Sequence, residues 1–123
     1  MKTQIVLPDP LAEALKRRLQ LEHFIADTVS SGKTALSWAA EHQPDLVILD
    51  LQLPDVHGYD VCHALRKLYH PWTVPILMLT GMDRPVDQLR GFAHGADAYL
   101  TKPYQPGELL KTVNLLLAET VMT

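Results

Sequence analysis

The chain has 123 residues, of which 47% are hydrophobic and 20% are charged. These values are typical of a globular domain with a buried core, and the net charge of −3 gives no electrostatic basis for binding nucleic acid or an anionic membrane. No apolar run is long enough to cross a bilayer, and the single cysteine, Cys62, cannot form an internal disulfide, so we expect a cytoplasmic protein.

Short apolar runs alternate with segments of helical periodicity along the whole chain. The runs predict strands at residues 3–7, 24–29, 46–49, 74–79 and 98–100. Helical spacing of apolar residues predicts helices that begin after Asp9, near Ser30, near Gly58, at Asp83 and at Pro106. Strict alternation with right-handed crossovers gives a parallel sheet covered by helices on both faces. We therefore predict an α/β fold in a single domain over residues 1–123.

The run at residues 46–49 is apolar throughout and ends at Asp50, which is typical of a strand buried on both faces. Ligands of parallel sheets bind beyond the carboxyl ends of the strands. Thr80 and Lys102 follow two other predicted strands, so we expect them near Asp50. A carboxylate can attack a phosphoryl group, while a hydroxyl and an ammonium can hydrogen-bond and neutralise its oxygens. The three side chains form a candidate phosphoryl site.

Three segments resemble the receiver domain of response regulators in two-component signalling. They are residues 44–54 (PDLVILDLQLP), residues 74–81 (VPILMLTG) and residues 95–104 (GADAYLTKPY). The resemblance extends over residues 3–119. It implies a flavodoxin-like, doubly wound sheet of five parallel strands in the order 2-1-3-4-5, with five helices.

The resemblance also implies roles for individual residues. Asp50 corresponds to the phosphoryl acceptor, which in the family takes the group from a histidine kinase or a phosphotransfer protein. Thr80 and Lys102 correspond to the residues that contact the phosphoryl group, and Tyr99 to the switch aromatic. The fourth helix, fifth strand and fifth helix form the face where the family binds other signalling proteins or a second copy, so this is the candidate face for a homodimer. We expect a signalling module and not an enzyme.

The metal-binding positions depart from the family pattern. The family has two adjacent acids after its first strand, and they hold Mg²⁺ together with the acceptor and a carbonyl two residues later, here that of Gln52. Alignment at the proline that opens the first helix puts Leu7 and Pro8 in place of the acids. Mg²⁺ requires hard oxygen ligands in near-octahedral geometry, and Asp50 with one carbonyl makes a poor site. We expect Mg²⁺ to bind weakly or not at all, unless Asp9 supplies a carboxylate.

Without the two acids, Lys102 can pair directly with Asp50, and we expect this ion pair at neutral pH. The resulting hypothesis is a phosphorylation-impaired receiver that binds a partner in one dominant conformation. Two alternatives stay open. One is a working phosphoacceptor that uses Asp9 to help bind Mg²⁺. The other is a small flavodoxin-like enzyme or nucleotide binder, although no Gly-rich phosphate loop follows the first predicted strand.

Overall fold

The computed structural model describes residues 2–6, 11–22, 24–29, 31–50, 57–68, 74–81 and 84–122. The strands are β1 Lys2–Val6, β2 Ile25–Val29, β3 Leu46–Leu49, β4 Ile76–Thr80 and β5 Ala98–Thr101. The helices are α1 Leu11–Leu21, α2 Gly32–His42, α3 Gly58–Leu68, α4 Pro85–Ala93 and α5 Pro106–Met122. None of these described helices is long and apolar enough to cross a membrane.

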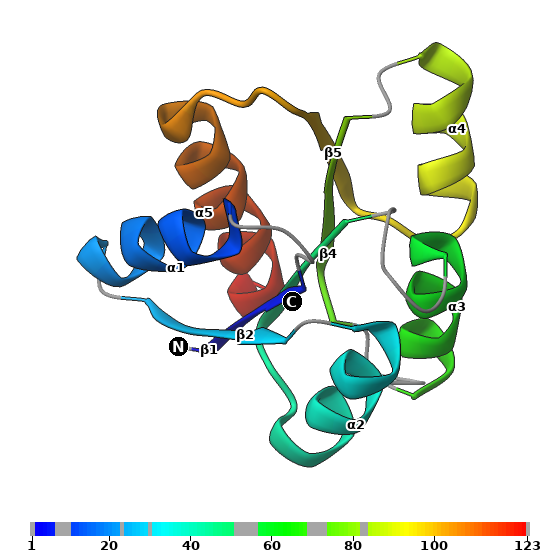
Figure 1. Cartoon of the computed structure of the whole chain (residues 1–123), viewed down its shortest axis with the longest axis horizontal. Helices are drawn as coiled ribbons and strands as arrows, with labels where there is room; N and C mark the ends of the chain where they lie inside the picture. The colour runs from blue at the N-terminus through cyan, green and yellow to red at the C-terminus, as the bar shows by residue number, and fades with distance from the viewer. Residues whose placement is uncertain are drawn as a thin grey trace.

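The strands form one parallel sheet in the order β2-β1-β3-β4-β5. β3 lies between β1 and β4, with Val6 opposite Leu49 and Val47 opposite Ile76. Helices α1 and α5 lie on one side of the sheet, and α2, α3 and α4 lie on the other (Figure 1). The predicted α/β fold and its flavodoxin-like strand order are therefore confirmed.

Alternate residues of the central strands supply two hydrophobic cores, one on each face of the sheet. Leu46 and Ile48 of β3 pack with Leu77 of β4 and with the buried side of α5. Val47 and Leu49 of β3 point to the opposite core, which α2 and α3 cover. All side chains of β3 and β4 are buried. A strand that is buried on both faces has no polar side chain before its end, as the unbroken apolar run predicts.

The boundaries of β4 and α4 differ slightly from the predicted ones. β4 begins at Ile76 rather than at residue 74, because Pro75 has no backbone N–H to donate to a neighbouring strand. The Pro75 carbonyl still accepts a hydrogen bond from the Val47 N–H at 3.0 Å. α4 begins two residues later than predicted, at a proline, which is favoured in the first helical turn. Gly95 follows the end of α4 with φ +110°, which confirms the predicted helix-terminating glycine.

Truncation of Leu77 tests the burial of β4. Leu77 is fully buried, so Leu77→Ala leaves a cavity and should lower the free energy of unfolding by about 2–5 kcal/mol. Leu115 on α5 is 58% exposed, and Leu115→Ala is the matched control, with an expected change below about 0.5 kcal/mol. Urea unfolding followed by circular dichroism measures both variants. Equal losses in the two would contradict the placement of β4 in the core.

The thiol of Cys62 provides a second test of core burial. The side chain is fully buried on α3, and this burial raises the pKa of the Cys62 thiol to about 11. The thiol is therefore protonated at pH 8. We expect an aromatic disulfide reagent to react with it about a hundredfold more slowly in the folded chain than in concentrated urea. Equal reaction rates in the two solvents would show that the Cys62 side chain is not buried against the core.

Candidate functional site

Three polar residues meet at the carboxyl edge of the sheet. Asp50 directly follows β3, Thr80 is the last residue of β4, and Lys102 directly follows β5. The three strands are neighbours in the sheet, so their ends share one edge, as the sequence predicts. Asp50 and Thr80 are both buried there. They lie in a region from which water is largely excluded, where electrostatic interactions are stronger than in water.

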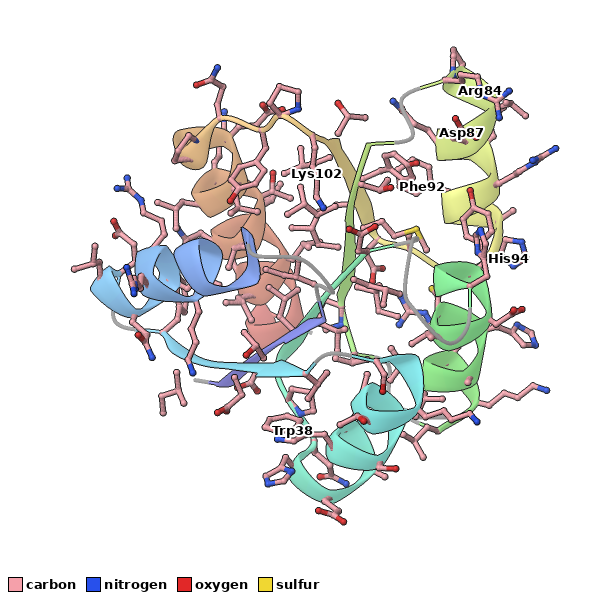
Figure 2. All side chains as sticks on the ribbon, viewed as in Figure 1. Trp38, Arg84, Asp87, Phe92, His94 and Lys102 are labelled. Carbon is pink, nitrogen blue, oxygen red and sulfur yellow. The ribbon has the colours of Figure 1, made fainter. Side chains whose placement is uncertain are left out.

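Lys102 joins the other two residues of this edge. Its Nζ donates to Oδ2 of Asp50 at 2.7 Å, and its backbone N–H donates to the carbonyl of Thr80 at 2.8 Å. The side chain of Asp50 is 4% exposed and that of Lys102 is 17% exposed. Burial of either ion alone would cost several kcal/mol, which the mutual attraction of the pair offsets. The ion pair expected from the sequence is therefore present, with Lys102 labelled in Figure 2.

Tyr99 lies on β5 beside Met78, its register partner on β4. Its ring packs directly against the backbone of α4, because a Cβ atom added to Gly91 would lie 2.8 Å from Cδ2 of the ring. The centroid of the Phe92 ring lies 6.5 Å from the centroid of the Tyr99 ring. Tyr99 therefore connects α4 to the part of the sheet that carries Thr80.

The described side chains at this edge offer Mg²⁺ one carboxylate, that of Asp50. The ion needs several oxygen ligands, and the Asp50 carboxylate is already hydrogen-bonded to Lys102. In the described ranges, no three His, Cys, Asp or Glu side chains are grouped so that they could hold a metal. The two residues that follow β1 in the chain, Leu7 and Pro8, have no side-chain oxygen. These two positions lie outside the described residues, as do Gln52 and Asp9, the other candidate ligands.

Sequence reasoning missed a buried acid on α4. Asp87 is 1% exposed, and its carboxylate accepts hydrogen bonds of 3.1 Å from both the backbone N–H and the guanidinium of Arg84. The guanidinium holds the pKa of the Asp87 carboxyl below its ordinary value. The bond from the Arg84 N–H to Asp87 is half of a capping box, but the sequence signature of that motif also needs Ser or Thr at the N-cap, where this chain has Arg84. No sequence signal indicates that the Tyr59 hydroxyl donates to the Asp87 carbonyl at 3.1 Å.

The response regulator receiver domain family matches residues 9–114 of the chain. The DNA-binding dual master transcriptional regulator RpaA of Synechocystis is 37% identical over 117 residues, which cover 94% of this chain and 48% of that protein. The DNA-binding response regulator MtrA of Mycolicibacterium smegmatis is 43% identical over 114 residues, which cover 92% of this chain and 49% of that protein. The chain spans about half the length of these relatives.

Solved structures give the same result. The BeF3-activated N-terminal receiver domain of Klebsiella pneumoniae RstA has a TM-score of 0.89 and 30% sequence identity, over 95% of this chain and 98% of that one. Receiver domains are signalling modules that accept a phosphoryl group and typically bind Mg²⁺ at the phosphorylation site. On its family match, its fold and the polar residues at its sheet edge, the chain belongs to the response regulator receiver domains of two-component signalling.

Proposed function

We propose that this receiver domain is a protein-interaction module in which phosphorylation of Asp50 is weak or absent. The proposal rests on the buried ion pair of Lys102 with Asp50 at 2.7 Å, combined with Leu7 and Pro8 at the positions of the metal-binding acids. Asp50 stands at the acceptor position, and Thr80 and Lys102 stand at the positions that contact the phosphoryl group. The residues of a phosphorylation site are thus retained without the acids that hold its ion.

The charge balance of the edge supports this proposal. The family pattern combines three carboxylates with one ammonium and leaves two negative charges, which a divalent cation balances. Among the described residues of this edge, one carboxylate faces one ammonium, and their charges balance. Phosphoryl transfer depends mainly on positioning and on neutralising the phosphoryl oxygens. Without the ion, the incoming oxygens and the attacking carboxylate of Asp50 repel each other, so transfer is slow.

The same pair favours one dominant conformation. In the unphosphorylated chain, Lys102 already bridges the Asp50 carboxylate after β3 and the Thr80 carbonyl at the end of β4. The ends of β3, β4 and β5 are therefore tied together without a phosphoryl group. A partner would recognise this single arrangement rather than a phosphorylation-dependent one.

The face of α4, β5 and α5 is the proposed contact surface for a partner. On α4, Val86, Leu89 and Phe92 are 40%, 70% and 47% exposed, and their spacing puts them along one side of the helix. The partner would be a histidine kinase, a phosphotransfer protein, another signalling protein or a second copy of the chain. The net charge of −3 provides no nucleic-acid surface on this domain. We further propose that residues 1–123 act as one domain in the cytoplasm.

A working phosphoacceptor is the second candidate function. Its support is that Asp50, Thr80 and Lys102 all stand at the sheet edge where acceptor chemistry requires them. In this reading Asp9 helps to bind Mg²⁺, and the acceptor carboxylate exchanges Lys102 for the ion during transfer. The two functions differ in whether Asp50 takes up a phosphoryl group at a useful rate.

Acetyl phosphate with Mg²⁺ separates these two functions. We expect intact-mass spectrometry of the unmodified chain to show little or no adduct of about 80 Da, the mass of a phosphoryl group. The double variant Leu7→Asp/Pro8→Asp should gain an adduct, because its added carboxylates supply ligands for Mg²⁺. Leu7→Asn/Pro8→Asn is the matched control, since it has similar size and polarity without the charge, and it should gain much less.

The position of any adduct is checked with Asp50→Ala, which must abolish it in every background. A rapid, stoichiometric adduct on the unmodified chain that Asp50→Ala removes would overturn the phosphorylation-impaired reading and establish the working acceptor. Absorbance spectra of the purified chain complete the test, because a copurifying flavin or nucleotide would favour a flavodoxin-like enzyme or nucleotide binder instead.

A double-mutant cycle measures the ion pair itself. Lys102→Met keeps an unbranched apolar side chain but leaves the Asp50 carboxylate buried without its ammonium, so we expect a loss of about 3 kcal/mol in the free energy of unfolding at pH 7. In the Asp50→Asn background, the same substitution should cost less by at least about 1 kcal/mol, because no buried charge is left behind. Urea unfolding of the four proteins gives the coupling energy, and strictly additive losses would argue against a direct pair.

A further inference from the structure

Helix α4 docks onto the domain without an apolar stripe. Along its whole described length, Pro85–Ala93, the buried residues are Asp87 and Gly91, whereas Val86, Leu89 and Phe92 are substantially exposed. A surface helix normally buries a stripe of apolar side chains against the core, as α5 does here. Contacts of another kind must therefore hold α4 in place.

One such contact comes from Tyr59, in the first turn of α3. Its hydroxyl donates to the carbonyl of Asp87 at 3.1 Å, and its ring stacks on His94 with 4.6 Å between the centroids and 12° between the planes. Asp87 lies in the first turn of α4 and His94 caps its end, so one side chain reaches both ends of the helix. Burial raises the pKa of Tyr59, so the hydroxyl keeps the proton that it donates. Figure 2 shows Asp87 and His94 on α4, with His94 at the junction with α3.

A second contact comes from the sheet. A Cβ atom at Gly91 would lie 2.8 Å and 2.9 Å from two carbons of the Tyr99 ring and 3.1 Å from the sulfur of Met78. Separations below 3.0 Å are shorter than van der Waals contact, so the ring fits against α4 only because residue 91 has no side chain. The Tyr99 ring thus presses on the middle of the helix from β5.

We infer that α4 is clamped by two tyrosine rings, Tyr59 from α3 and Tyr99 from β5, and that these rings are the positioning residues for the exposed row of Val86, Leu89 and Phe92. The clamp is a property of the unphosphorylated chain. Only the use of the row by a partner rests on the proposed function.

Because α4 is held mainly by this clamp, it can open locally while the rest of the fold stays intact. It consists of one hydrogen bond, one ring stack and one close approach to the helix backbone. Neither hydrophobic core contains a residue of α4. Regions that bury few apolar contacts open locally at a lower free energy than the core does. Loss of a clamp contact should therefore free α4 while both cores stay closed.

Amide hydrogen exchange of unphosphorylated protein tests the clamp, with peptides from α4 compared with peptides from α5. Gly91→Ala should speed exchange across residues 85–93 about tenfold or more, since the added methyl displaces the helix or the Tyr99 ring. The matched control is Gly107→Ala in the first turn of α5, where an added Cβ meets nothing within 4 Å. It should change exchange in α4 by less than about twofold.

Tyr59→Phe tests the other ring and also decides the question if Gly91→Ala does not fold. It removes the hydroxyl that bonds to Asp87 and keeps the stack on His94, so exchange in α4 should rise by roughly two- to tenfold. Tyr59→Leu removes both contacts and should give a larger rise, with α5 unchanged in each variant. Exchange in α4 that stays at the wild-type rate in the folded tyrosine and glycine variants, or that rises equally in α4 and α5, would overturn the clamp. Since no phosphoryl donor is used, neither outcome depends on whether Asp50 accepts phosphate.

Discussion

Burial of β3 and β4 on both faces is the constraint on which the site depends. Every side chain of these strands is enclosed by helices, so polar side chains can enter only at the strand ends. This places Asp50 and Thr80 at one edge, with the end of β5 beside them. A buried carboxylate is costly unless it is paired, and Lys102 at 2.7 Å provides the pairing charge. This ion pair thus follows from how the core is built.

The pair has a consequence for stability as well as for chemistry. A group of carboxylates at one sheet edge repels itself, and such repulsion is an example of the strain that functional sites carry at the expense of stability. If Leu7 and Pro8 replace two of these carboxylates, as we propose, that repulsion is reduced, and Lys102 pairs with Asp50. If the edge is electrically neutral before phosphorylation, rearranging it around a phosphoryl group gains little electrostatic free energy. The proposed single conformation and the proposed weak phosphorylation therefore have the same electrostatic origin.

The parallel sheet could be predicted from local signals, whereas its strand order and the ion pair were expected from the resemblance to receiver domains. The apolar run at residues 46–49 indicates a doubly covered strand, and residues at neighbouring strand ends must meet. The attachment of α4 could not be predicted in this way. Its exposed Leu89 and Phe92 have the spacing that usually marks a buried face, and the bond from Tyr59 to Asp87 joins residues 28 positions apart with no shared periodicity. Only the three-dimensional packing distinguishes an outward apolar row from an inward one.

Strand β5 connects the two unusual features of this domain. Its end is fixed to the site, because Lys102 binds both Asp50 and the Thr80 carbonyl. Two residues before the end of β5, the ring of Tyr99 contacts α4 at Gly91. A change in the Lys102–Asp50 distance would therefore shift β5 and reach α4 through that ring. With the ion pair formed at rest, β5 is already held at the sheet edge, and the proposed function therefore requires no phosphoryl group to position α4.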